Sequence, residues 1–106
     1  MLTQEKEREL QNFAREIRIQ TIRQIGIRGF GHIGGCMSIA DLLSVLYGED
    51  MKYDPQNPSW EGRDWLVCSK GHAGPAIYAA LALKGFFPME WMETLNQPGT
   101  NLPSHC

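Results

Sequence analysis

The 106-residue sequence lacks the features that mark several large classes of protein. No uninterrupted apolar stretch reaches the roughly 18 residues of a membrane-spanning helix, so we expect no membrane partner. Residues 1–18 are rich in charge and hold no apolar segment, so we expect no secretory signal. Lysine and arginine (10) do not outnumber aspartate and glutamate (12), and the net charge is −2. This balance argues against a nucleic-acid partner, which requires a basic face.

Cysteine is also scarce, and the three thiols, of Cys36, Cys68 and Cys106, cannot all pair within the chain. None lies in a C-x-x-C pattern, so we expect reduced thiols in a cytoplasmic protein, with Cys36 and Cys68 as small apolar fillers. There is no phosphate-binding P-loop and no Ser-His-Asp order. The apolar fraction of 42% is ordinary, so the length and composition predict one small domain at most rather than a disordered chain.

Apolar periodicity and turn residues predict a mostly helical chain. A first helix is expected over residues 3–25, because apolar residues recur along one side, with Gly26 as its stop signal. Residues 26–35 contain five glycines, which favour irregular structure that a ligand can approach closely. A second helix is expected from Ser38, because Ser38 and Asp41 form a capping-box pattern ahead of an apolar run.

Four further features complete the predicted order. They are an end to the second helix at Gly48, a buried strand over Asp64–Cys68, a helix over Pro75–Leu83 that ends at Gly85, and a short helix over Pro88–Leu95. A single strand cannot form a sheet. The chain is therefore expected to be part of an α/β layer structure.

The predicted strand, the turn after it and the next helix form an arrangement that binds anions in α/β proteins. Lys70, Gly71 and His72 occupy that turn, where backbone N–H groups and the helix dipole favour phosphate. The alternative is a surface turn with an incidental histidine. His32 and His105 also lie in predicted loops, and histidine is the usual side chain for proton transfer near neutral pH.

Two of the histidines also allow a metal-binding reading. His32 with Cys36, and His105 with Cys106, provide ligand types that zinc prefers. The paired spacings typical of zinc sites are missing, so this reading stays an alternative.

Three segments taken together resemble the transketolase family. Residues 31–47 read GHIGGCMSIADLLSVLY and resemble the family's G-H-x-G-G-x-x-S-x-A-D-[IL]-L-x-x-L-Y segment. Residues 54–58 (DPQNP) and 63–78 (RDWLVCSKGHAGPAIY) resemble D-P-x-N-P and R-D-x-x-x-x-S-K-G-H-x-x-x-x-x-Y. Residues 102–105 (LPSH) resemble a loop that usually reads L-P-G-H-P. The compact loop before Arg63 looks most like the N-terminal subunit of split bacterial transketolases.

This resemblance implies an α/β fold, a parallel sheet flanked by helices, of which residues 1–106 would be the leading, mostly helical and incomplete part of the diphosphate-binding (PP) domain. It implies a thiamine diphosphate enzyme that transfers a two-carbon ketol unit between sugar phosphates, with Mg²⁺ or Ca²⁺ anchoring the cofactor. Lys70, Gly71 and His72 would bind the cofactor, whereas His32 and His105 would face the substrate as catalytic and substrate-binding residues. The partner would be a C-terminal transketolase subunit, in a homo- or hetero-oligomer with its active site at the interface.

The sequence departs from the family pattern in two places. Ser104 and Cys106 stand where the third loop usually has glycine and proline. The G-D-G…N metal-binding segment is absent, so the metal ligands are expected beyond residue 106, and the 106 residues alone are expected to be inactive. A deoxyxylulose-phosphate synthase, or another enzyme of this cofactor, is the related alternative. A non-catalytic truncated interaction module is the alternative from a different class.

Overall fold

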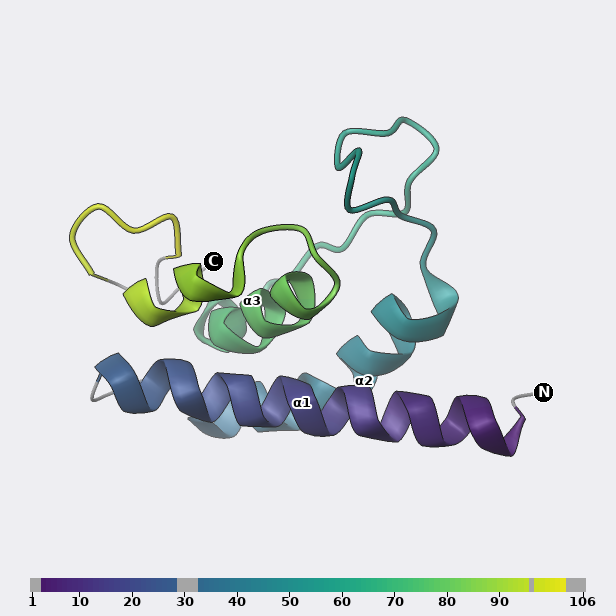
Figure 1. Ribbon diagram of the computed structural model, residues 1–106, viewed down its shortest axis with the longest axis horizontal. Coiled ribbons are helices and arrows are strands. Elements are labelled where there is room, and N and C mark those ends of the chain that lie inside the picture. The colour runs from purple at the N-terminus through teal and green to yellow at the C-terminus, as the bar shows by residue number, and fades with distance from the viewer. Residues whose placement is uncertain (1–2, 29–32, 96, 103–106) are drawn as a thin grey trace.

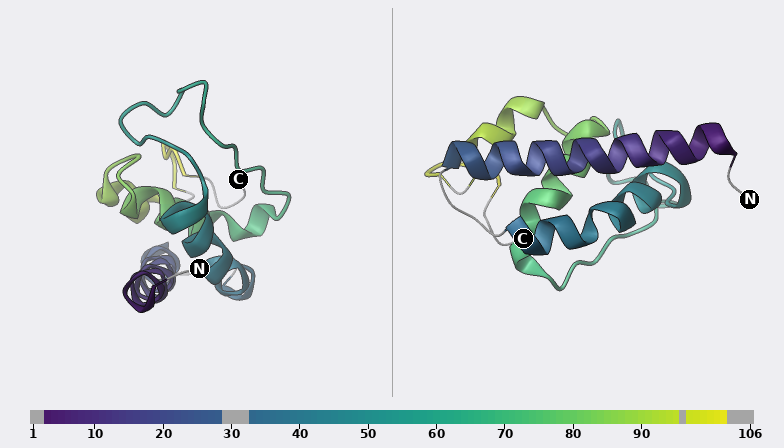
Figure 2. Two further views of the ribbon diagram at one scale, coloured as in Figure 1. Left: turned by 90° about the vertical axis from the view of Figure 1, so that its right-hand side faces the viewer. Right: turned by 90° about the horizontal axis from the view of Figure 1, so that it is seen from below.

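The structure, a computed structural model, describes residues 3–28, 33–95 and 97–102. Its three α-helices are α1 (Gln4–Arg28), α2 (Ile33–Val45) and α3 (Gly74–Leu83). Helices α1 and α2 run side by side in opposite directions, and α3 lies over the pair and contacts both (Figures 1 and 2). The described part of the chain is therefore a helical layer, as expected for a mostly helical fragment.

Three shorter helical segments connect or follow the α-helices. They are the π-helical η1 (Leu46–Asp50) and the 3₁₀ segments η2 (Gly71–Ala73) and η3 (Met89–Thr94). Segment η1 continues α2 through Gly48, so the prediction that Gly48 ends the helical path is wrong. Segment η3 follows Pro88 and confirms the short helix predicted there, in 3₁₀ form.

Helix α1 confirms the first predicted helix but continues past its predicted end. The Thr3 Oγ1 accepts a hydrogen bond of 3.0 Å from the backbone N–H of Lys6 and so satisfies one of the free amides at the helix start. The helix then runs through Gly26 to Arg28, so the predicted stop is wrong. A Cβ at position 26 would meet nothing within 4 Å. This glycine therefore lies at an open surface position, where a helix tolerates it at a cost of about 1 kcal/mol.

Helix α2 begins five residues before the predicted start at Ser38. The Ser38 Oγ donates a hydrogen bond of 2.9 Å to the carbonyl of Gly35 inside the helix, so it does not cap a helix start. The carboxylate of Asp41 instead binds Arg18 on α1, at 3.2 and 3.1 Å. Helix-to-helix contacts thus override the local glycine signal, and the prediction that residues 33–35 are irregular is wrong.

The strand predicted over Asp64–Cys68 is absent from the described residues. Asp64 donates its N–H to the carbonyl of Lys52, but no second strand lies alongside to continue a ladder. The side chains still alternate, since Trp65 and Val67 are 72% and 82% exposed whereas Leu66 and Cys68 are half-buried. The alternation of side chains that the sequence predicts is therefore present. The predicted strand is wrong for the described residues, because no neighbouring strand pairs with the segment.

Helix α3 confirms the prediction for residues 75–83. It begins at Gly74, one residue before Pro75, and it is followed by Gly85 at a φ of +90°, a left-handed conformation that glycine adopts without strain. Its four alanines are all buried. Small side chains let this helix approach α1 and α2 closely, which explains its position across both.

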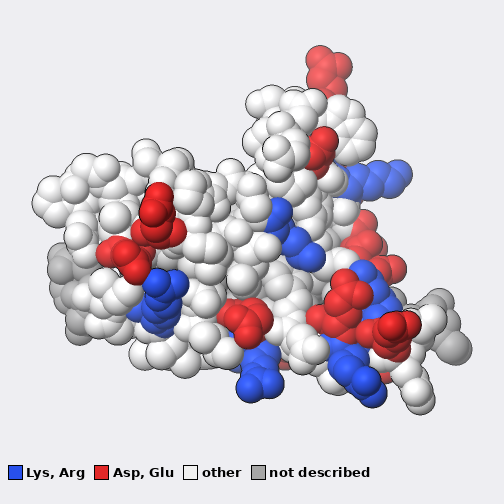
Figure 3. Space-filling view, viewed as in Figure 1, with Lys and Arg blue, Asp and Glu red and all other residues white. Residues whose placement is uncertain are grey.

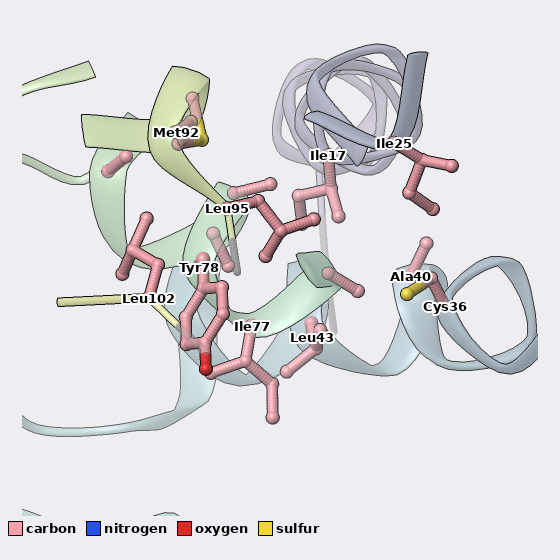
Figure 4. Close-up of a cluster of buried hydrophobic side chains, with 14 of the residues drawn as sticks. Ile17, Ile25, Cys36, Ala40, Leu43, Ile77, Tyr78, Met92, Leu95 and Leu102 are labelled. Atoms are coloured by element: carbon pink, nitrogen blue, oxygen red, sulfur yellow. The ribbon is translucent and has the colours of Figure 1, made fainter. Parts of the chain in front are cut away.

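The core lies where α3 meets the other two helices (Figure 4). Its fully buried side chains include Ile17 of α1, Cys36 of α2 and Met92 of η3. One buried polar side chain links two elements of the core: the Gln24 Nε2 donates to the carbonyl of Pro75 at 2.8 Å. The full burial of Cys36 fits the predicted role of an apolar filler.

Charged side chains of both signs lie next to one another on the face shown in Figure 3. The ion pairs between elements include Lys6 with Glu49, Arg18 with Asp41 and Arg23 with Glu93. Within the described ranges, no helix combines the length and hydropathy needed to cross a bilayer.

Candidate anion-binding site

The turn at residues 70–73 joins the irregular segment to α3. Lys70 precedes η2, and η2 leads directly into α3, whose start carries no side-chain cap. The N–H of Ala73 bonds to the carbonyl of Lys70 at 3.0 Å, which closes the turn. The turn therefore lies at the positive end of the α3 dipole, as the sequence predicts for an anion site.

The first turn of α2 lies directly against this turn. A Cβ at Gly35 would come within 2.5 Å of the His72 Cδ2, 3.0 Å of the His72 Nε2 and 3.3 Å of the Lys70 Cε. No real Cβ fits at 2.5 Å, so glycine is what lets the imidazole and the lysine stem lie on the helix. The position of His72 is thus set by residue 35, which is 37 positions earlier in the sequence.

Lys70 supplies a positive charge that no described carboxylate neutralises. Its Nζ donates to the Ser38 Oγ at 2.5 Å, and none of the ion pairs among the described residues includes it. An ammonium held by a neutral hydroxyl keeps its full charge for an incoming anion. Lys70 is half-buried, so it is less screened than a lysine that extends into water.

Two thiols hold the backbone of the same turn. The Cys68 Sγ donates to the carbonyl of Lys70 at 3.4 Å, and the Cys36 Sγ donates to the carbonyl of His72 at 3.8 Å. These are weak donors, so the bonds orient the turn more than they stabilise it. The arrangement can bind a phosphate-like anion through an ammonium, an imidazole and backbone amides.

Of the site residues predicted from sequence, the structure places Lys70, Gly71 and His72 in one turn. The side chains of Lys70 and His72 lie against Gly35 of α2. His32 and His105 lie outside the described residues, so their predicted place near substrate stays a prediction. The zinc alternative stays untested for the same reason. Within the described ranges, no group of three or more His, Cys, Asp or Glu residues could hold a metal ion.

Sequence reasoning missed Gly35 and Ser38 as parts of this site. The glycine-rich pattern groups Gly35 with the other glycines of residues 26–35, and the spacing to Asp41 predicts that Ser38 caps a helix. No local pattern could reveal their contacts with residues 70 and 72, because only the packing of α2 on the turn creates them.

The fold and this turn define a class of protein, namely a helical layer that presents a lysine and a histidine at the start of one of its helices. The family model described as "Transketolase, thiamine diphosphate binding domain" matches residues 9–106. The chain therefore belongs to the transketolase family, as its sequence motifs predict.

Relatives include a protein named as a transketolase subunit and a protein named as a transketolase. The chain is 58% identical to the 6-deoxy-6-sulfo-D-fructose transketolase subunit SqwG of Clostridium sp. (strain MSTE9), over 96% of this chain and 37% of that protein. It is 42% identical to Transketolase 1 of Escherichia coli (strain K12), over 71% of this chain and 12% of that protein. The chain thus spans less than two fifths of the length of these relatives.

A solved structure gives the same assignment. Transketolase from Leishmania mexicana superposes with a TM-score of 0.86 at 33% identity, over 91% of this chain and 14% of that one. The helical layer is therefore a recognisable piece of the transketolase fold.

Proposed function

We propose that this chain is the leading part of the thiamine diphosphate-binding domain of a transketolase-type enzyme, and that Lys70, Gly71 and His72 hold the diphosphate of the cofactor. The observation that carries the proposal is the unneutralised ammonium of Lys70 beside the His72 imidazole, in a space that a side chain at Gly35 would fill. A diphosphate fits this donor set, because a compact ammonium, a ring N–H and backbone amides are all donors to anionic oxygens. Family membership supplies the identity of the cofactor.

When bound, thiamine diphosphate supplies the carbanion chemistry at its thiazolium ring. The residues of this chain bind and orient: Lys70 neutralises diphosphate charge, and His72 donates to a diphosphate oxygen. His32 and His105 exchange protons with the hydroxyls of the sugar substrate, a contribution that typically amounts to about 100- to 10,000-fold in rate. A divalent metal, Mg²⁺ or Ca²⁺, would be held by residues beyond position 106.

The irregular segment supports the proposal that residues 1–106 form an incomplete domain. Its side chains Trp65 and Val67 are 72% and 82% exposed. Residues 66–70 of the segment also line a groove of about 420 Å³ together with residues of α2, η1 and α3. Further strands of a parallel sheet would cover both features. The 106 residues alone are then inactive, and activity belongs to an assembly with a C-terminal transketolase subunit whose active site lies at the interface.

The reaction proposed is transfer of a two-carbon ketol unit from a ketose phosphate to an aldose phosphate. The 58% identity to a subunit named for 6-deoxy-6-sulfo-D-fructose makes that sugar a second candidate donor. Both donors carry an anionic group, so this charge does not distinguish them. A ketol-transfer assay with each donor in turn shows which one the enzyme uses.

The test uses the full-length protein assembled with its partner subunit. Lys70→Ala and His72→Ala should each weaken thiamine diphosphate binding by about 10- to 100-fold in calorimetric titration, the effect of losing a hydrogen bond to a charged group. Lys52→Ala is the matched control, because Lys52 is an exposed lysine in the segment before the turn. His32→Ala should reduce ketol transfer with little change in cofactor affinity. Unchanged affinity in both the Lys70 and His72 variants would refute the site.

A further inference from the structure

The hydroxyl of Ser38 has a fixed orientation in this structure. Ser38 lies one turn after Gly35 on the same face of α2, and its Oγ donates to the Gly35 carbonyl at 2.9 Å. A serine hydroxyl has a single proton. Because the carbonyl takes that proton, the oxygen presents its lone pairs to the Lys70 Nζ, 2.5 Å away.

This contact addresses a specific weakness of lysine as an anion ligand. A lysine side chain has four rotatable bonds and loses more conformational entropy on ordering than most residues. A contact that orders the side chain before the anion arrives removes part of that loss from the binding equilibrium. The ammonium has two further N–H groups, which remain for an anion while the third is on Ser38.

The neutrality of Ser38 matters as much as its geometry. A carboxylate at position 38 would hold Lys70 in the same place but would cancel its charge. A hydroxyl orders the ammonium and leaves the charge in place. Gly35 belongs to the same unit, since its carbonyl accepts the hydrogen bond from Ser38 and its missing side chain leaves space for the Lys70 stem. The Lys70 Cε lies 3.3 Å from where a Cβ of residue 35 would be.

We propose that Ser38 is a positioning residue that pre-orders the Lys70 ammonium for the cofactor diphosphate, an inference that rests on the proposed function. Ser38 is exposed and lies outside the core, so its role in folding is small. Its effect should therefore appear in diphosphate affinity rather than in stability, and it should depend on the presence of Lys70.

The experiment measures the affinity of the assembled full-length protein for thiamine diphosphate and for inorganic diphosphate by calorimetry. Ser38→Ala should raise both dissociation constants by about two- to tenfold, because the ammonium keeps its charge and its bonds to the anion and loses only one ordering contact. Ser38→Thr keeps the hydroxyl and should restore affinity to within about twofold of the parent. Ser38→Asp should bind more weakly than Ser38→Ala, because it neutralises the charge that the alanine variant keeps. Ser59→Ala, in an exposed loop, is the matched control and should leave both constants unchanged.

A double-mutant cycle shows whether Ser38 changes diphosphate affinity through Lys70. In a Lys70→Met background, Ser38→Ala should add no further loss, because there is no ammonium left to order. Equal losses in both backgrounds, or no loss in the parent, would overturn the inference. If Lys70→Met itself leaves diphosphate affinity unchanged, the proposed function of Lys70 fails and the inference fails with it. Thermal unfolding midpoints of all variants should agree, and a lowered midpoint in Ser38→Ala that Ser38→Thr does not restore would also overturn the inference.

Discussion

The helical layer and the segment over residues 51–70 differ in how fully their apolar side chains are covered. In the layer, Ile17 and Met92 are 0% and 1% exposed, and small side chains allow close packing. In the segment, Trp65 and Val67 are mostly exposed, and a single backbone bond joins residue 64 to residue 52. Apolar side chains are therefore covered in the helical layer and left exposed in the segment over residues 51–70. The candidate site lies where the two regions join, on the turn that connects the segment to α3.

The largest predicted effect separates the inner and outer faces of α1. Ile17→Ala should lower the free energy of unfolding by about 2–5 kcal/mol, because it leaves a cavity in a fully buried position. Ile22→Ala, on the same helix and 54% exposed, should stay within about 0.5 kcal/mol of the parent protein. Denaturant unfolding of the full-length protein measures both changes. Similar losses in the two variants would show that the outer face of α1 is covered too.

The next effect tests whether the open segment is covered in the complete domain. Val67→Ser should destabilise the full-length protein by most of the roughly 1.5–3 kcal/mol that full burial of a valine contributes. Its 82% exposure in residues 1–106 alone would predict almost no effect. Hydrogen exchange at the amides of residues 65–68 is the companion measurement. Rapid exchange together with a neutral Val67→Ser would contradict the proposal of an incomplete sheet.

A third prediction concerns the space at Gly35. The methyl group in Gly35→Ala would lie 2.5 Å from the His72 Cδ2, so the imidazole must move, which a side chain can do at little cost in stability. We expect a loss of about tenfold in diphosphate affinity, in the range for one hydrogen bond to a charged group. Gly34→Ala is the control on the same helix, since its Cβ meets nothing within 4 Å. It should leave affinity unchanged and stabilise the protein by up to about 1 kcal/mol. Equal affinities in the two variants would show that the Gly35 space has no role in diphosphate binding.

The smallest effect concerns the ion pair between α1 and α2. The Arg18 guanidinium lowers the pKa of the Asp41 carboxyl below its ordinary value of 3.8. The pair therefore stabilises the folded protein at pH values above this ordinary pKa. The contribution is lost as the pH falls through the lowered pKa. Because the Asp41 side chain is 79% exposed, we expect less than about 1 kcal/mol. The stability difference between the parent and Asp41→Asn should shrink on acidification from pH 5 to pH 2. A difference that stays constant over this range would contradict this assignment.

Much of the fold could be predicted from local patterns, because local chemistry determines it. The apolar side of α1, the alanine-rich α3 and the left-handed Gly85 are all readable from residues close together in the sequence. The start of α2 was not predictable, since glycine disfavours a helix locally and the contacts of Gly35 with Lys70 and His72 come from residues more than 30 positions away. The predicted strand failed for a related reason: its pattern is present, but its partners are not among the described residues.

The candidate site shows the same division. The sequence predicts Lys70 and His72 as anion-binding candidates, because a glycine turn before a helix is typical of anion sites and the motif resembles a known family. Gly35 and Ser38 were not predictable, because they act across more than 30 residues of sequence through contacts that only the packed structure reveals. Local sequence thus indicates which residues are candidates for binding, and the packed structure shows which residues contact them.

The most direct test of the central claim is a crystal structure of the full-length protein, assembled with its partner and with thiamine diphosphate and Mg²⁺ bound. The account predicts that the Lys70 Nζ and a ring nitrogen of His72 each lie within about 3.2 Å of a diphosphate oxygen, the range of a normal hydrogen bond. It also predicts that Ser38 still contacts Lys70. A diphosphate bound elsewhere, with Lys70 and His72 turned away from it, would contradict the account.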